Sequence, residues 1–392
     1  MLRVKTMSFM LEFFPRICTG AFNFYRDIKI SKLSKTPSEK SKSEIKFERK
    51  IDTVLNQHSK LLIVVPSSEF ESSNWGFGQG NYWFEIHASY SEYLGYDVEL
   101  FVFDVNARVY DEFERLRESL IANNFSHMLA SLESNPGSNS WDWDHFAIGI
   151  AKSWSGLVIG LSTDSVYRRH QVNFRRFIKF YRETVVIGID VFPDFKYLDK
   201  NHYFGPTLLP ISRGSIARID NELQKFADTG QPFDTVFAGA VYEYRKKLLT
   251  DIAGFGLKVE VNPHKRLDAQ SHDFSYASYI QSLKTGKLAL NLSRANGVDT
   301  RQLKSRVLEA PVFGIPILSD ENILISKFFI QETEYLFFEL SKSSISDINK
   351  VLLNRVLLSS ISHSAQVKAR KIAQSTFWNT VAEACQRQSA HV

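Results

Sequence analysis

The sequence predicts an α/β protein built from two Rossmann-like domains. An apolar run of strand length, a loop with three glycines, a helix and a second strand follow one another over residues 61–103. A strand, a polar loop, a helix and a second strand recur over residues 287–320, and a proline- and glycine-rich segment at 206–234 separates the two patterns. A chain of 392 residues is long enough for two domains with cores of their own.

Residues 1–60 differ in composition from the rest of the chain. They carry a charge excess of +7, whereas the other 332 residues sum to about −2. We interpret them as a basic N-terminal helix and a Lys/Ser-rich linker. An alternative is a helix in a membrane interface, with Phe9, Met10, Phe13 and Phe14 on its apolar face, and therefore peripheral membrane contact through residues 1–50.

The first folded domain is predicted over residues 61–205. Its opening strand is Leu61–Pro66, and a helix over Tyr82–Leu94 follows the glycines. Further strands are expected at 97–103, 127–132, 157–161 and 185–189. Gly76 and Gly78 lie in the loop after the first strand, where the backbone could approach a bound phosphate or an acceptor. A loop that only joins the strand to the helix is the alternative, because the spacing is not that of a dinucleotide-binding loop.

Polar residues follow several of these strands, at the edge of a parallel sheet where ligands bind. They are Glu133, Ser162, Asp164 and Asp190. Each is a candidate for contact with an acceptor, and each is as well explained as a turn residue. The helix expected between Val166 and Arg182 is rich in arginine, which indicates a solvated face; no nucleic-acid-binding module accompanies it.

An interdomain linker is predicted over residues 206–234, and the second domain over 235–375. The strand Thr235–Gly239 opens this domain and leads into a helix that contains Arg245. A glycine at the end of a first strand and an arginine entering the following helix are suited to a diphosphate, so Gly239 and Arg245 are candidate ligands. A surface arginine is the alternative. A strand at 257–261 and a helix at 276–283 follow.

The stretch from Lys287 to Asp320 contains most of the candidate ligand-binding residues. It predicts a buried strand at 288–292, a polar loop, a helix from about Thr300 to Phe313, and a strand at 315–319. The loop and the helix N-terminus would lie at the carboxyl edge of the sheet, where backbone N–H groups favour a phosphate. Candidate ligands in the loop and on the first turns of the helix are Ser293, Arg294, Gln302, Lys304, Arg306 and Glu309. Cations suit a pyrophosphate and a carboxylate accepts from a ribose diol, so the set suits a nucleoside diphosphate.

This stretch resembles the donor-binding core of glycosyltransferases with the GT-B fold, in particular the retaining type with a K-x-R-x-x-E motif. Lys304, Arg306, Glu309 and Gly314 match that motif, and Tyr335–Leu340 resembles the segment that follows it. The resemblance implies two facing Rossmann-like domains, with Glu309 on the ribose and Lys304 and Arg306 on the diphosphate as the catalytic residues. One position departs from the pattern: many relatives have a second glutamate where this chain has Arg301.

The resemblance therefore implies a hexosyltransferase-like enzyme that moves a sugar from a nucleotide-activated donor to a carbohydrate, lipid or protein acceptor, as in cell-surface polysaccharide biosynthesis. No metal or other cofactor is expected, because no Asp-x-Asp pair lies in the donor stretch and the cations would stabilise the departing diphosphate. Two cysteines at opposite ends and no apolar run of about 20 residues favour a cytoplasmic protein, with the inner membrane face as the peripheral alternative.

Two other classes of protein stay open. One is a non-catalytic nucleotide- or sugar-binding relative of the same fold, which Arg301 makes plausible. The other is a different Rossmann-type nucleotide-sugar enzyme such as an NAD-dependent epimerase, which would need a G-x-G-x-x-G loop and a Tyr-x-x-x-Lys pair. The tail from 343 is predicted to be helical. Its last helix, within 376–392, is expected to cross back to the first domain with Phe377 and Trp378 as anchors.

Overall fold

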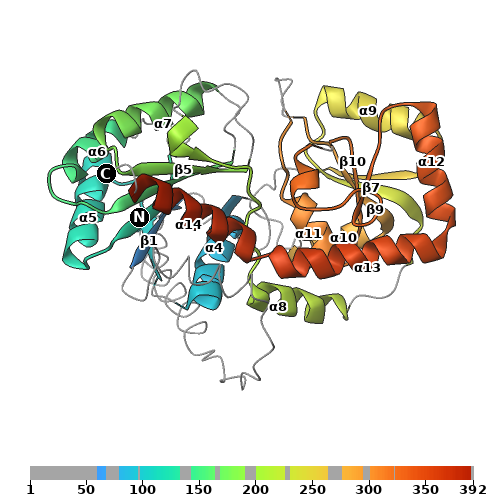
Figure 1. Ribbon diagram of the computed structural model, residues 1–392, viewed down its shortest axis with the longest axis horizontal. Helices are drawn as coiled ribbons and strands as arrows, with labels where there is room; N and C mark the ends of the chain where they lie inside the picture. The colour runs from blue at the N-terminus through green and yellow to red at the C-terminus, as the bar shows by residue number, and fades with distance from the viewer. Residues whose placement is uncertain are drawn as a thin grey trace, which may run out of the picture. The chain divides into compact units, whose positions relative to one another are not determined.

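The computed structural model describes residues 60–67, 79–95, 98–132, 143–163, 168–189, 200–225, 230–263, 276–294, 301–321 and 323–389. Two parallel sheets with helices packed on them make up this part of the chain (Figure 1). The predicted α/β fold with two Rossmann-like domains is confirmed. The N-terminal segment and the loop with Gly76 and Gly78 lie outside the described residues.

The first sheet has six described strands in the order β2-β1-β3-β4-β5-β6, and all neighbouring strands are parallel. Their bounds are Leu61–Pro66 (β1), Val98–Phe103 (β2), His127–Ser131 (β3), Leu157–Ser162 (β4), Thr184–Gly188 (β5) and Tyr203–Phe204 (β6). The first five agree with the predicted strands to within one residue at each end, because continuous apolar runs mark strands that are covered on both faces. The short β6 was not predicted.

Four described helices belong to this sheet. They are α4 (Gln79–Leu94), α5 (Val109–Ala122), α6 (Trp143–Ile150) and α7 (Arg168–Phe180). A core of aromatic rings fills the space between the sheet and helices α5, α6 and α7. Phe113, for example, lies against Phe103, Trp143 and Phe146 with ring centroids 5.2–5.5 Å apart.

The segment predicted as an interdomain linker contains a helix, α8 (Arg213–Leu223), which was not predicted. Ser212 begins the helix, and its side chain accepts a hydrogen bond from Ser215 N at 3.2 Å. Two glutamates of α4 complete the cap. Glu85 accepts from Ser212 N at 2.6 Å, and Glu92 accepts from Arg213 N at 2.6 Å. The helix dipole favours carboxylates at a helix N-terminus. These two hydrogen bonds therefore connect α4 to the start of α8.

The second sheet has five described strands in the order β11-β10-β9-β7-β8, again parallel. Their bounds are Phe233–Gly239 (β7), Val259–Pro263 (β8), Gly286–Asn291 (β9), Ile317–Ser319 (β10) and Tyr335–Phe337 (β11). Helices α9 (Glu243–Gly254), α10 (Tyr276–Lys284) and α11 (Arg306–Val312) connect them, with a short 3₁₀ turn at Ile325–Lys327. The predicted strands are found with ends shifted by up to two residues.

The predicted helix from Thr300 to Phe313 was wrong at its start, since α11 begins only at Arg306. Arg301 and Gln302 pair with the loop after β9 instead. Arg301 forms an isolated antiparallel bridge with Arg294, and Gln302 N donates to Ser293 O at 3.0 Å. Gln302 and Lys304 therefore precede the helix rather than lying on its first turns.

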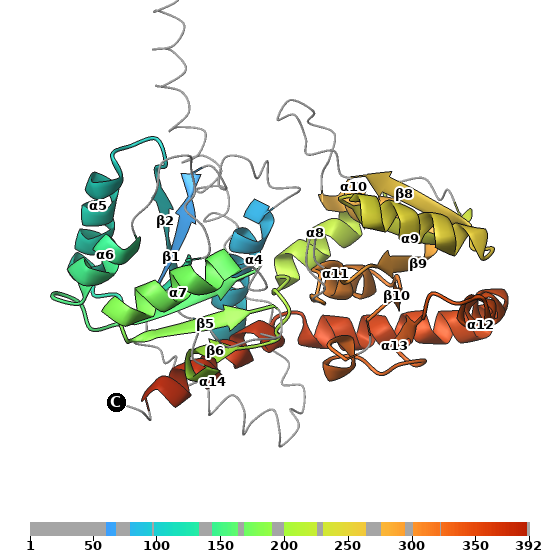
Figure 2. The same ribbon diagram turned by 90° about the horizontal axis from the view of Figure 1, so that it is seen from above.

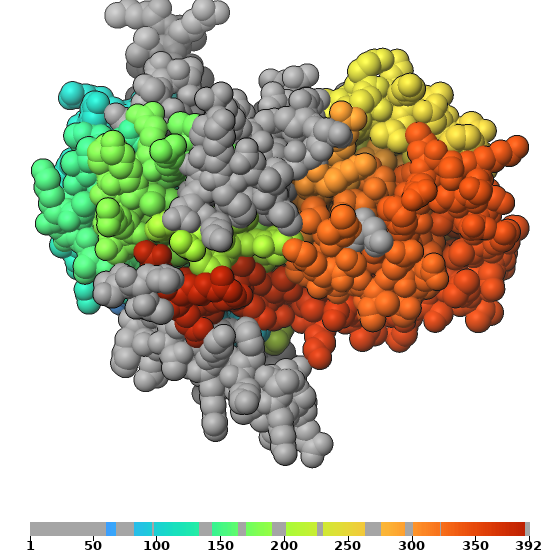
Figure 3. All heavy atoms as spheres, turned by 45° about the horizontal axis from the view of Figure 1, so that its top comes forward, coloured from blue at the N-terminus to red at the C-terminus, as the bar shows by residue number. Residues whose placement is uncertain are grey.

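The tail forms α12 (Lys342–Leu353), α13 (Arg355–Ile372) and α14 (Ser375–Ser389). The last helix lies against the first sheet: α14 packs along β5 and β6 (Figure 2). In the space-filling view the red atoms of the C-terminal tail lie beside the green ones (Figure 3). Phe377 and Trp378 are fully buried, and Trp378 Nε1 donates to Ser89 Oγ of α4 at 3.0 Å. None of the described helices combines the length and the apolar character needed to cross a bilayer.

Candidate functional site

The candidate site lies at the carboxyl edge of the second sheet. β7, β9 and β10 are neighbours there and end at Gly239, Asn291 and Ser319. Because all three strands are parallel, their C-terminal ends and the loops that leave them meet at one edge, which is where ligands bind in open α/β sheets. Most of the predicted site residues in the described part of the chain are found on these loops and on the helices that follow.

Arg245 comes from the first turn of α9 and points back over the strand ends. Only 5% of it is exposed, so the alternative of a surface arginine was wrong. Its Nη1 donates to Ala240 O at 2.8 Å, and its Nη2 lies 3.5 Å from Leu292 O and 3.4 Å from Arg294 O. Its Nε is buried and has no hydrogen-bond partner. Arg245 therefore bridges the loops after β7 and β9 and still has an unused donor.

Arg306 comes from the start of α11 and is also buried, with 8% exposed. Its Nη1 donates to Leu290 O of β9 at 3.1 Å. Its guanidinium carbon lies 4.7 Å from the ring centroid of Phe237, and Arg245 lies 5.6 Å from the same ring. A Cβ atom at Gly239 would lie only 2.6 Å from Arg306 Nη2, so the glycine at the end of β7 makes room for this guanidinium.

These two arginines form a concentrated positive charge. Among the residues that the structure describes, neither guanidinium forms an ion pair with a carboxylate. Burial lowers the pKa of Arg306, and the charge of Arg245 lowers it further, although Tyr279 and Glu309 act in the opposite direction. Two buried like charges oppose each other, so an anion at this edge would be strongly favoured.

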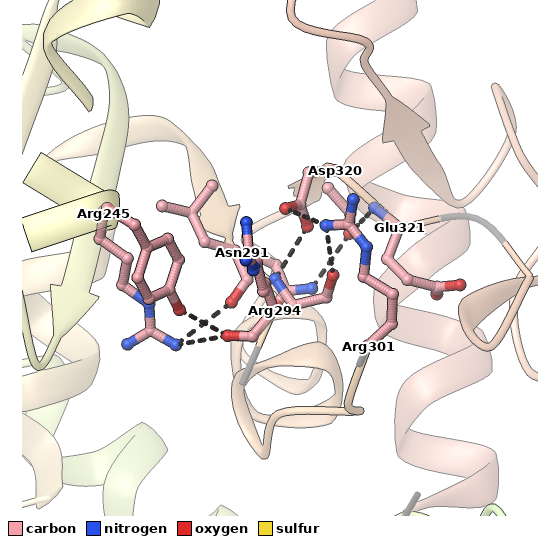
Figure 4. A network of polar contacts seen from close by, with 10 residues as sticks. Arg245, Asn291, Arg294, Arg301, Asp320 and Glu321 are labelled. Atoms are coloured by element: carbon pink, nitrogen blue, oxygen red, sulfur yellow. Dashed lines mark hydrogen bonds and ion pairs between the residues drawn. The ribbon is translucent and has the colours of Figure 1, made fainter. Parts of the chain in front are cut away.

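The loop after β9 is held by a polar network that also includes Arg245, through Arg294 O (Figure 4). Asp320, which follows β10, accepts from Ser293 N at 2.8 Å and from Arg301 Nη1 at 2.7 Å. The same Arg301 nitrogen lies 3.3 Å from Ser293 Oγ. Tyr244 adds a hydrogen bond from its hydroxyl to Arg294 O at 2.5 Å. Arg301 thus has a structural partner in Asp320, which explains why an arginine fits at this position.

Gln302 and Lys304 lie between this loop and α11. Gln302 is buried, and Lys304 is half-buried with its Nζ hydrogen-bonded to Gln302 Oε1. Lys304 is thus placed close to the start of α11, on the chain segment that leads to Arg306. Its predicted role on a diphosphate is not tested by this contact.

Glu309 lies on α11, one turn after Arg306, and is partly buried. Tyr279 of α10 donates its hydroxyl hydrogen to Glu309 Oε2 at 3.1 Å. Withdrawal from water raises the pKa of Glu309, while the nearby hydroxyls of Ser305, Tyr279 and Tyr276 favour its ionised form. The carboxylate is therefore oriented by side chains of a neighbouring helix and keeps acceptor positions for a ligand.

The structure brings together Gly239, Arg245, Ser293, Arg294, Gln302, Lys304, Arg306 and Glu309 around the ends of β7 and β9 and the start of α11. Gly76 and Gly78 lie outside the described residues, so their predicted contact with the donor stays a prediction. Sequence reasoning missed Phe237, Tyr279 and Asp320. Tyr279 could have been found, because the expected helix 276–283 carries two tyrosines one turn apart that share a face.

The fold and this edge define an α/β protein with two Rossmann-like domains and a cationic site at the carboxyl edge of the second sheet. Residues 236–386, which are 151 of the 392 residues, match a family model described as glycosyl transferase-like. The resemblance to glycosyltransferases is thereby confirmed for the second half of the chain, and the match does not decide whether the reaction retains or inverts configuration. A comparison with curated proteins found no match.

Three solved structures of similar fold illustrate the range of sequence identity and TM-score. A glycosyltransferase from Rickettsia africae is 8% identical with a TM-score of 0.49, over 85% of this chain and 99% of that chain. The Anabaena protein Alr3699/HepE in complex with UDP-glucose is 11% identical with a TM-score of 0.44, over 85% and 99%. A UDP-N-acetylglucosamine 2-epimerase from Listeria monocytogenes is 10% identical with a TM-score of 0.41, over 80% and 94%. These low identities add nothing about activity.

Proposed function

We propose that this protein is a glycosyltransferase that takes its sugar from a nucleotide-activated donor bound at the carboxyl edge of the second sheet. The observation that carries the proposal is the pair of buried guanidinium groups of Arg245 and Arg306, which share the ring of Phe237 and have no carboxylate partner among the described residues. A diphosphate supplies the negative charge that such a pair lacks.

The roles of the residues follow from their positions. Arg245 has a buried Nε without a partner, a donor that a phosphate oxygen would satisfy. Arg306, which is anchored to Leu290 O of β9, would add a second positive charge next to the diphosphate. Lys304, in the segment before α11, would add a third. As the bond to the sugar breaks, negative charge grows on the diphosphate, and cations already in place lower the energy of that state.

Glu309 would accept hydrogen bonds from the ribose hydroxyls. Its carboxylate is oriented by the hydroxyl of Tyr279, so it enters the complex without a large loss of rotamer freedom. The contact would bind substrate and transition state alike, which predicts an effect on donor affinity rather than on the chemical step.

Retention of configuration, independence of metal ions and a hexosyl donor are parts of this proposal that rest on the family resemblance. The acceptor class, whether carbohydrate, lipid or protein, the role in cell-surface polysaccharide synthesis and the cytoplasmic location stay predictions of the same kind. The carbohydrate acceptor is the one we propose to test first.

The experiment measures nucleotide release from a panel of UDP- and GDP-sugars with the full chain, together with binding of UDP and GDP. Arg245→Ala is compared with Lys247→Ala, an exposed cation two residues further along α9. We expect the Arg245 variant to lose about 10²-fold in turnover and Lys247→Ala to keep it. Arg245→Lys, which retains the charge, separates loss of charge from loss of folding.

Glu309→Ala and Lys304→Ala should each lower transfer at subsaturating donor by roughly 10²-fold as well, Glu309→Ala through a higher donor KM and Lys304→Ala through a lower kcat. Near-native turnover by both, or an Arg245→Ala variant that folds and releases nucleotide like the unmodified protein, would remove the proposed site. Binding of a nucleotide sugar with no release of nucleotide would favour the non-catalytic relative instead.

A further inference from the structure

Tyr244 contacts Arg294 at two points. Tyr244 lies on the first turn of α9, one residue before Arg245, and is half-buried. Its hydroxyl donates to Arg294 O at 2.5 Å, and the guanidinium carbon of Arg294 lies 5.5 Å from the centroid of the Tyr244 ring. One tyrosine of α9 therefore holds both the backbone and the side chain of an arginine in the loop after β9.

The backbone of this loop is held from both sides. Arg245 Nη2 lies 3.4 Å from the same carbonyl oxygen of Arg294 that Tyr244 contacts (Figure 4). On the other side, Ser293 N donates to Asp320 at 2.8 Å. Burial raises the pKa of the Tyr244 hydroxyl above its ordinary value, so the hydroxyl keeps the hydrogen that it donates. The peptide unit of Arg294 therefore has a defined position relative to α9.

The ring of Tyr244 also brings Arg294 into line with the buried arginines of the candidate site. The guanidinium carbon of Arg245 lies 5.6 Å from the centroid of this ring. Arg245 and Arg306 lie in the same way over the ring of Phe237. Cations and rings thus alternate from one contact to the next, and Arg294 is the third guanidinium group in the series. Aromatic rings attract cations and do not neutralise them, so the three groups keep their charge.

A third guanidinium group suits a ligand with a second phosphate group. Guanidinium groups bind phosphate oxygens through charge-assisted, often bidentate hydrogen bonds. A nucleoside monophosphate and the diphosphate of the same base differ only by one phosphate group. The diphosphate therefore brings the additional negative charge and acceptor oxygens that a third guanidinium group can bind.

We propose that Tyr244 is a positioning residue of the donor site: it holds Arg294 where this arginine binds the second phosphate group, and so favours nucleoside diphosphates over monophosphates. This inference rests on the proposed function. It deepens that function, because it gives a tyrosine outside the predicted site a part in selecting the class of nucleotide that the site takes.

The test measures the dissociation constants of UDP, UMP, GDP and GMP for the full chain and for Tyr244→Phe, Arg294→Gln and the double variant. Tyr244→Phe removes only the hydroxyl and keeps the ring. Tyr242→Phe is the matched control, because the exposed ring of Tyr242 stacks on that of Tyr244 with centroids 6.2 Å apart and also lies over Arg245. Arg294→Gln tests the cation by itself, with Tyr244 unchanged.

We expect Arg294→Gln to weaken binding of the diphosphate roughly tenfold, and Tyr244→Phe to weaken it roughly threefold to fivefold. Binding of the monophosphate should change less than about twofold in either variant, because Arg245 and Arg306 remain. The double variant should bind the diphosphate as Arg294→Gln does, because the hydroxyl acts only through this arginine. A merely structural role of Tyr244 would instead lower the affinity for both nucleotides.

Three results would overturn the inference alone: a Tyr244→Phe variant that binds the diphosphate like Tyr242→Phe, an equal loss for monophosphate and diphosphate, or additive losses in the double variant. Failure of the unmodified protein to bind any of the four nucleotides would overturn the proposed function and this inference with it. The two failures are therefore distinguishable in one set of titrations.

Discussion

The guanidinium groups of Arg245 and Arg306 lie over one ring, that of Phe237, although they come from helices more than fifty residues apart in the sequence. Each is anchored to backbone carbonyl groups at the ends of β7 and β9. Cation–π contact and carbonyl acceptors lower the cost of burying these charges, and neither neutralises them. The arrangement thus keeps two cations beside the strand ends in a fixed geometry before any ligand arrives, as a preorganised anion site requires.

Gly239→Ala should disturb this pair. The new methyl group would meet Arg306 Nη2 at 2.6 Å, and the φ angle of +152° is one that alanine rarely adopts. We expect binding of a nucleoside diphosphate to weaken roughly tenfold or more, as when one hydrogen bond to a charged group is lost. Isothermal titration calorimetry with UDP and GDP measures this change in the dissociation constant. Gly254→Ala on α9 is the control, since no atom lies within 4 Å of the added methyl group there; an equal loss in both variants would contradict the account.

Tyr279→Phe should weaken the hold of Glu309 on the donor. The substitution removes only the hydroxyl that donates to Glu309 Oε2 at 3.1 Å. A hydrogen bond to a charged group is worth about 1.5–3 kcal/mol, so we expect the donor KM to rise about tenfold with kcat nearly unchanged. Steady-state kinetics over a donor series provides the measurement. Tyr242→Phe, at an exposed tyrosine before α9, should leave both constants as they are; a fall in kcat alone at Tyr279→Phe would assign the hydroxyl to the chemical step.

The sequence predicts the framework of this site better than its contacts. Continuous apolar runs such as Leu61–Pro66 marked the strands, because covered parallel strands need apolar residues on both faces. The start of α11 was placed too early, because Arg301 is held by Asp320, nineteen residues further on, and local propensity cannot report such a pair. The link from Tyr279 to Glu309 spans thirty residues and has the same character. Local patterns thus predict elements, and the partners of buried polar groups come only from the fold.

The free energy of unfolding should depend on pH through two buried groups, Glu85 and His127, whose pKa values shift in opposite directions on folding. The folded-state pKa of Glu85 is raised from 4.5 to about 7, so the folded protein holds a proton that the unfolded chain releases, and stability falls as pH rises through this window. The shift corresponds to roughly 3 kcal/mol at pH 7 and above. His127 behaves oppositely: burial lowers its pKa from 6.5 to about 4, so stability falls as pH drops through that window.

Urea unfolding of Glu85→Gln and His127→Gln between pH 4.5 and pH 8 separates the contribution of Glu85 to the pH dependence of stability from that of His127. Relative to the unmodified protein, Glu85→Gln should gain stability as pH rises from 5 to 7, and His127→Gln should gain stability as pH drops from 6.5 to 4.5. Glu92→Gln provides the baseline for replacing a glutamate on α4. Parallel curves for Glu85→Gln and Glu92→Gln would show that Glu85 titrates normally in the folded protein.

Trp378 should be a major anchor of α14. It is fully buried, its ring lies edge-on to Tyr90 of α4 with centroids 4.8 Å apart, and its Nε1 donates to Ser89 Oγ. Trp378→Phe removes the hydrogen bond and part of the ring, so we expect a loss of about 1–2 kcal/mol of unfolding free energy. Trp378→Ala also opens a cavity and should cost about 3–5 kcal/mol.

The control for the Trp378 variants is Val367→Ala, at an exposed position of α13. It should change the free energy of unfolding by less than about 0.5 kcal/mol. Urea unfolding of the three variants gives the free energies directly. Because α14 is the only described helix after α13 and lies along β5 and β6, loss of its anchor should loosen the C-terminal tail before either sheet melts. Hydrogen exchange should then show faster exchange in α14 of Trp378→Ala, with the amides of β7 and β9 unaffected; uniform loss of protection would instead mean that α14 unfolds together with both sheets.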